Sequence, residues 1–128
     1  MTLREFEVDI PLGRITGLRA GHDGPRVLAL HGWLDNAASF VPLADHLAGI
    51  QLVAPDLPCH GRSAHPAPGA EYTSGVAVNA VLDIADALGW ETFSLLGHSM
   101  GAGIASLMAA SVPHRVQRLV LIEALDFH

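Results

Sequence analysis

Short apolar runs alternate with amphipathic segments along the chain, and this alternation predicts strands and helices in turn. Two short stretches, 5–10 and 14–18, are separated by a Pro-Leu-Gly turn and predict a pair of neighbouring strands. Four further runs are apolar apart from Gln51 and Ser94, as expected for strands that are covered on both faces of a sheet. These runs are 27–30, 51–54, 93–96 and 119–122.

Three segments between the continuous runs have helical character. The first follows an Asp-Asn pair at 35–36, either of which can cap a helix that extends to about Leu47. The second follows a Thr-Ser pair at 73–74, places its apolar residues on one face and stops at Gly89. The third is a segment of small residues just before the last apolar run.

The order of the predicted elements defines the fold class. Two strands are followed by β-α-β-α-β-α-β, which is typical of an α/β protein with a mostly parallel sheet flanked by helices. The length of 128 residues corresponds to one domain, 1–128, and the hydrophobic fraction of 50% excludes a disordered tail.

Charge and cysteine content narrow the range of partners and locations. The formal net charge is −6, with 7 Lys and Arg against 13 Asp and Glu and no basic run, so we expect no nucleic-acid partner. Cys59 is the only cysteine, which excludes an intramolecular disulfide. No secretory signal and no apolar run long enough for a bilayer is present, so we predict a cytoplasmic protein without a membrane partner.

The motif Gly97-x-Ser99-x-Gly101 lies between a predicted strand and a predicted helix. A sharp strand-to-helix turn pushes a serine hydroxyl out of the fold and holds its backbone under strain. Glycine is favoured at 97 and 101 because side chains there would collide. We expect three small residues to let the following helix lie close to the sheet, namely Ala102, Gly103 and Ala105.

A nucleophilic serine also requires donors for the oxyanion that forms after its attack. One expected donor is the backbone N–H of Met100, at the start of the helix. The second is expected from the loop after the first continuous strand, and Trp33, which follows His31 and Gly32, is the candidate.

Three segments in this order resemble the α/β-hydrolase superfamily: His31-Gly32-Trp33, the loop 56–63 and the segment 97–102. The stretch 31–40 most resembles the serine hydrolase-like branch, which is related to lipases and esterases. The resemblance runs from about residue 5 to residue 127. It implies a partial α/β-hydrolase fold that lacks the C-terminal strands and the lid.

The resemblance also implies a serine hydrolase that acts on a small ester-like substrate without a cofactor or metal. In the superfamily the triad follows the order serine, acid, histidine. Glu123 is a candidate triad acid and Asp126 a weaker one, whereas the catalytic histidine is expected beyond residue 128. We therefore expect this chain to be the N-terminal part of one domain, inactive alone and prone to self-association or to pairing with a complementing chain through its open sheet edge.

Other residues near these segments are expected to have structural roles. His31 is expected to brace the oxyanion loop by hydrogen bonding, and His98 to be a packed neighbour of the nucleophile. Asp56 is expected to cap its own loop through side-chain to backbone bonds. Cys59 stands where the superfamily usually has glycine, so the loop is expected to bend differently or to carry strain of about 1 kcal/mol.

The glycine-rich segment 97–103 also fits a different class of protein. It follows a strand as the phosphate-binding turn of short-chain dehydrogenases does, and Glu123 lies about 20 residues further on, where a ribose-binding acid stands. This interpretation leaves His31 and Asp56 without a role. An NAD(P)-binding oxidoreductase remains an alternative, as does a non-catalytic binding module or one half of a split enzyme.

Overall fold

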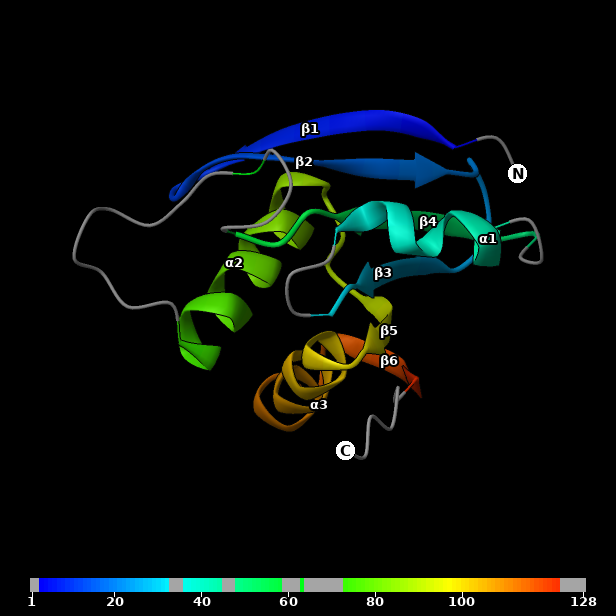
Figure 1. Cartoon of the computed structure of the whole chain (residues 1–128). Helices are drawn as coiled ribbons and strands as arrows, with labels where there is room; N and C mark the ends of the chain where they lie inside the picture. The colour runs from blue at the N-terminus through cyan, green and yellow to red at the C-terminus, as the bar shows by residue number, and fades with distance from the viewer. Residues whose placement is uncertain (1–2, 33–35, 45–47, 59–62, 64–72, 123–128) are drawn as a thin grey trace, which may run out of the picture.

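The computed structural model describes residues 3–32, 36–44, 48–58, 63 and 73–122. The strands form one six-stranded sheet in the order β1-β2-β4-β3-β5-β6, with β1 and β6 at opposite ends (Figure 1). The strands are β1 (Arg4–Ile10), β2 (Gly13–Ala20), β3 (Arg26–Leu30), β4 (Gln51–Pro55), β5 (Phe93–His98) and β6 (Val116–Ile122). β2 is antiparallel to β1 and β4, while β4, β3, β5 and β6 are mutually parallel. The predicted fold class is confirmed.

Helices cover the two faces of the sheet because the strands alternate their side chains. Leu28 and Leu30 of β3 pack with α2 (Ser74–Ala87) and α3 (Met100–Ser111) in the larger core. Ala29, between them, belongs to a smaller core on the other face with Phe40 of η1 (Ala37–Phe40). The continuously apolar strands in the middle of the sheet are therefore buried on both sides, as their sequence predicts.

The first predicted helix differs from the structure. Its described part is the 3₁₀ turn η1 followed by the four-residue α1 (Val41–Ala44), and residues 45–47 lie outside the described residues. η1 and α1 follow each other without a gap, and Pro42, the second residue of α1, has no N–H to donate to the preceding turn. Asn36 caps η1, since its side chain accepts a bond of 2.8 Å from the Ala38 amide. Asp35, the alternative cap, also lies outside the described residues.

The second helix begins and ends where its sequence predicts. The Thr73 side chain accepts a hydrogen bond of 3.2 Å from the Val76 amide and caps α2. Gly89 follows the helix with a φ of 74°, a conformation in which glycine carries no side-chain clash.

The start of β6 is fastened by Arg115. Its guanidinium donates to the carbonyl oxygens of Glu91 and Trp90 at 2.8 and 2.9 Å and to the Asp86 carboxylate at 2.7 Å. The same group lies 5.6 Å from the centre of the Phe93 ring. These contacts join the end of α2, the beginning of β5 and the beginning of β6, so they fix β6 beside the strand that precedes Ser99.

The last strand is apolar but exposed: it is not buried as its apolar run alone would suggest, and it forms the open sheet edge that is expected for this chain. Leu119, Val120, Leu121 and Ile122 are 38–55% exposed. Within the part of the chain that the structure describes, β6 pairs only with β5, so it forms an edge of the sheet. An apolar sequence indicates that a strand can be buried on both faces. It does not indicate whether the helices or strands that would cover those faces are present.

The two edges of the sheet differ in how well they resist pairing with another chain. Glu5 and Glu7 are exposed on β1, and charges on an edge strand oppose strand addition. β6 carries a single charge, Arg118, and its last four residues, 119–122, are apolar on both faces. We therefore expect residues 1–128, produced alone, to self-associate by pairing β6 of one copy with β6 of another.

This expectation is tested by placing a charge on β6. Val120→Lys should convert the self-associated chain largely to monomer, measured by light scattering during size-exclusion chromatography. Leu107→Lys is the matched control, because Leu107 is 41% exposed on α3 and lies off the edge. A monodisperse monomer before any substitution would contradict the expectation.

No helix of the described part is long and apolar enough to cross a membrane.

Candidate active site

Ser99 stands at a sharp turn between β5 and α3. Its φ of 56° and ψ of −116° make it the only non-glycine residue with positive φ among the described residues. It occupies the N-cap position of α3 without a side-chain capping bond, and the residue is exposed. The hydroxyl is therefore presented at the end of the parallel strands on a strained backbone, and strain of this kind concentrates at functional sites.

The backbone of Ser99 is held from two sides. Its N–H donates to the Ile122 carbonyl oxygen at 3.1 Å, and its own carbonyl oxygen accepts from the amides of Ala102 and Gly103 at 2.9 and 3.3 Å. The first bond comes from the edge strand β6 and the other two from the first turn of α3. The turn therefore depends on both elements that follow it in the sequence.

The two glycines of the motif are required by backbone packing. A Cβ on Gly97 would lie 2.5 Å from the Gly101 carbonyl oxygen, and one on Gly101 would lie 2.1 Å from the Leu30 carbonyl oxygen. Both neighbours are main-chain atoms that no rotamer change can move. Gly101 therefore allows α3 to begin against the end of β3.

Gly103 does not have the predicted role. A Cβ at this position would meet nothing within 4 Å, and the residue is exposed. Ala102 and Ala105 are buried and form the contact with the sheet, while Gly103 lies on another side of the helix. The dinucleotide interpretation needs its third glycine for close helix–strand packing, so this finding counts against it.

The segment after β3 reaches Ser99. A Cβ on Gly32 would lie 3.2 Å from Ser99 Cβ and 3.6 Å from Ser99 Oγ. Trp33, the candidate second oxyanion donor, lies outside the described residues. Met100, the other candidate, is the first residue of α3, where the amides have no acceptor within the helix. The segment 32–36, which begins at Gly32, is hereafter called the oxyanion loop after its expected role.

His31 is buried and both its ring nitrogens are engaged. Nε2 accepts a bond of 2.9 Å from the Leu57 amide, so the ring proton is on Nδ1, which donates to the Gly32 carbonyl oxygen at 2.7 Å. This arrangement fits the expected bracing role and leaves no nitrogen free to accept a proton from Ser99. His98 is half-buried, with its Nδ1 3.5 Å from the position of a Cβ on Gly32.

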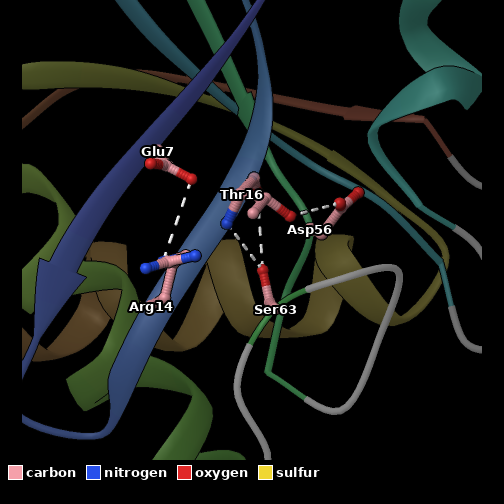
Figure 2. Close-up of polar contacts among 5 residues, drawn as sticks. All are labelled: Glu7, Arg14, Thr16, Asp56 and Ser63. Atoms are coloured by element: carbon pink, nitrogen blue, oxygen red, sulfur yellow. Dashed lines mark hydrogen bonds and ion pairs between the residues drawn. The ribbon is translucent and has the colours of Figure 1, made fainter.

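Asp56 forms two long-range hydrogen bonds that the sequence does not predict. Its carboxylate does not cap its own loop within the described residues, but accepts from the Ala37 amide at 2.8 Å and from Thr16 Oγ1 at 2.9 Å (Figure 2). These partners lie 19 and 40 residues away along the chain, while most of the loop that Asp56 is predicted to cap lies outside the described residues, so that prediction stays untested. Thr16 and Ser63 were not singled out from the sequence, since threonine in a strand and serine in a loop carry no specific signal.

Several predicted residues lie outside the described residues: Trp33, Cys59, Glu123 and Asp126. β6 does pair with β5, and His98 is in register with Ile122, so residue 123 follows the strand next to the one that carries Ser99. Within the described residues, no three His, Cys, Asp or Glu side chains gather as a metal site would require.

Comparison with known proteins identifies the family. A family model described as alpha/beta hydrolase fold matches residues 25–128. A serine hydrolase-like protein of Dictyostelium discoideum is 45% identical over 124 residues, which cover 91% of this chain and 34% of that protein. The chain therefore belongs to the α/β-hydrolase family.

Solved structures agree with this assignment. The crystal structure of a hypothetical protein from Pseudomonas aeruginosa matches with a TM-score of 0.87 and 46% identity, covering 96% of this chain and 44% of that one. A membrane phospholipase A, described as a bacterial virulence factor, matches with a TM-score of 0.89 and 34% identity, covering 95% and 40%. The chain spans less than half the length of each of these three relatives.

Proposed function

We propose that Ser99 is the nucleophile of a serine hydrolase that cleaves an ester-like bond in a small molecule. The observation that carries the proposal is the strained, exposed serine at the start of α3, with Gly32 against its side chain. The names of the relatives support a serine hydrolase, and the phospholipase neighbour supports an ester as the bond.

In the proposed reaction, Ser99 Oγ forms a bond to the substrate carbonyl carbon and its proton passes to a base. The carbonyl oxygen becomes an oxyanion that accepts bonds from the Met100 amide and from a donor in the oxyanion loop. The oxyanion collapses, the bond to the leaving alcohol breaks, and the base returns its proton to that alcohol. Water then hydrolyses the acyl-enzyme by the same steps in reverse order.

The base is proposed to come from polypeptide beyond residue 128. Both nitrogens of His31 are engaged, and the longer relatives leave room for a late histidine. Glu123 is the proposed triad acid, because it follows the strand beside β5. Residues 1–128 alone are then expected to show little or no ester turnover, since loss of a triad member lowers the rate by several orders of magnitude.

The test uses a fluorophosphonate probe on the complete gene product. Labelling is expected, with the modified peptide containing Ser99, and Ser99→Ala should abolish it. Ser106→Ala is the matched control, because Ser106 lies on the same helix and bonds to the Ala102 carbonyl oxygen. No labelling together with saturable dinucleotide binding would support an oxidoreductase, and no labelling with no such binding would support a non-catalytic protein.

A further inference from the structure

Two arginines lie side by side at the end of the sheet formed by β1 and β2. Arg4 is the first residue of β1 and is directly opposite Arg19 of β2 in the antiparallel register. Side chains that are opposite each other in this way point to the same face of the sheet, with Cβ atoms about 5 Å apart. Like charges in this position repel each other and destabilise the strand pair, so the two arginines favour a neighbouring negative charge.

The carboxylates of β1 do not supply that charge, because they lie on the other face of the sheet. Residues 5, 7 and 9 are acidic and alternate with Arg4 along the strand, and successive side chains of a strand point to opposite faces. The ion pair between Glu7 and Arg14 lies on that other face, with 3.8 Å between Glu7 Oε2 and Arg14 Nε (Figure 2). β2 contains no acidic residue. The alternation of the strands therefore separates these acids from Arg4 and Arg19.

The described carboxylates of other elements do not neutralise the pair either. Among the residues that the structure describes, neither Arg4 nor Arg19 forms an ion pair. Arg115 is different, since its guanidinium reaches the Asp86 carboxylate at 2.7 Å. Arg19 is half-buried, and its Nε is shielded from solvent without a hydrogen-bond partner in the described part of the chain. Burial of a charged donor without an acceptor is costly, so this arrangement favours an acceptor from outside the chain.

The surroundings of the two arginines strengthen their attraction for an anion. They are on the face of the sheet that α2 covers, where Phe6 and Ile15 of the same two strands join the larger core. Apolar neighbours exclude water on that side, and interactions between charges are stronger where water is excluded. Arg4 is exposed, so a ligand can reach the pair from solvent. Arg26 begins β3 on the same face, where its guanidinium lies 6.0 Å from the centre of the buried Trp90 ring, and it adds positive charge to this end of the sheet.

We propose that Arg4 and Arg19 bind the phosphate group of a ligand. A guanidinium is planar and offers parallel N–H donors that match the oxygens of a phosphate. A phosphate group carries about 1.5–2 negative charges at neutral pH and has three acceptor oxygens, so it can bridge both arginines and neutralise both. A carboxylate would neutralise only one of them. Binding at Arg19 Nε requires rotation of a half-exposed side chain and no movement of the backbone.

The phosphate site is separate from the proposed active site. Arg19 is in register with Val53 of β4, and the same row continues through Leu28 of β3 to Leu95 of β5, four residues before Ser99. The arginines therefore lie toward the beginning of the parallel strands, whereas Ser99 follows the end of β5. Binding of phosphate at this position goes beyond the proposed function and does not depend on it.

Isothermal titration of the complete gene product with inorganic phosphate tests the site. At low ionic strength we expect saturable binding with a Kd of about 1 mM, and binding about 10-fold weaker in Arg4→Gln and in Arg19→Gln. Arg14→Gln is the matched control, because Arg14 is on the same strand as Arg19 but on the opposite face, and the affinity should stay unchanged. Acetate, which carries a single charge, should bind about 10-fold more weakly than phosphate.

Thermal unfolding of the same variants measures the repulsion between the arginines. Without phosphate and at low ionic strength, Arg4→Gln is expected to raise the Tm, because it removes one of two opposed charges. Phosphate should raise the Tm of the unsubstituted protein by binding its folded state, and should leave the Tm of Arg4→Gln nearly unchanged. A lower Tm for the variant, with the same response to phosphate as the unsubstituted protein, would contradict the inference.

Vesicles of phosphatidylcholine that contain phosphatidic acid distinguish the sources of the phosphate group. Cosedimentation that Arg19→Gln abolishes would assign the phosphate to a lipid, whereas phosphate binding without cosedimentation would assign it to a soluble compound. Absence of saturable phosphate binding, or an affinity that neither arginine substitution lowers, would overturn the inference. Fluorophosphonate labelling should be unchanged in both variants because the arginines are remote from Ser99, so the failure of one proposal leaves the other intact.

Discussion

Replacing Ser99 with glycine is expected to stabilise the protein while removing its proposed nucleophile. Ser99 has a φ of 56° and a ψ of −116°, a region that glycine adopts far more readily than serine. Such strain amounts to about 1–3 kcal/mol, and the greater flexibility of glycine in the unfolded chain offsets part of the gain. We expect the free energy of unfolding to rise by about 1 kcal/mol and labelling to fall by several orders of magnitude.

The comparison with Ser99→Ala separates the two effects. Alanine also removes the hydroxyl, but it has a Cβ and keeps the backbone strain. It should therefore be equally inactive without being stabilised. Urea denaturation of the complete gene product measures the stabilities, and a glycine variant less stable than the alanine variant would show that the turn is not strained.

Gly101→Ala is expected to have the largest effect on stability. The added Cβ would lie 2.1 Å from the Leu30 carbonyl oxygen and 2.8 Å from that of His31. Both belong to the chain at the end of β3, so α3 must move away from the sheet. Overpacking of this kind lowers the free energy of unfolding by about 1–3 kcal/mol, and by more where only backbone surrounds the site. We expect a loss of at least about 3 kcal/mol, or no folded protein.

Gly103→Ala is the matched control for this prediction. It makes the same chemical change two residues later in the same helix, where a Cβ would meet nothing within 4 Å. Alanine has a higher helix propensity than glycine, so the free energy of unfolding should rise by about 0.5–1 kcal/mol. Denaturant unfolding of both variants checks the pair, and similar effects at the two positions would contradict the packing argument.

The fold was predictable because its signals are local and periodic. The buried strands show as continuous apolar runs, and α2 carries its cap Thr73 and its stop Gly89 in the sequence. The predicted elements differ from the structure where the local apolar pattern does not determine the result. The first helix begins as a 3₁₀ turn, and the apolar β6 is exposed because nothing described pairs with its outer edge.

The candidate site was predictable only in its local part. Ser99, Gly97 and Gly101 follow from the geometry of one turn, which five adjacent residues encode. The bonds of Asp56 to Ala37 and Thr16 span 19 and 40 residues, and no spacing rule connects those positions. For Gly103 the error is different. A packing role is predicted because this glycine lies next to the motif, but its position along the helix places it away from the sheet.

The bond from the Ser99 amide to Ile122 has a consequence for biosynthesis. The ribosome adds Ile122 well after Ser99, and β6 must then leave the exit tunnel before it can pair with β5. During synthesis, Ser99 therefore leaves the ribosome before the strand that bonds to its amide. Its backbone reaches the conformation described above only after β6 has paired with β5, so any chemistry at this serine must wait for that stage of folding.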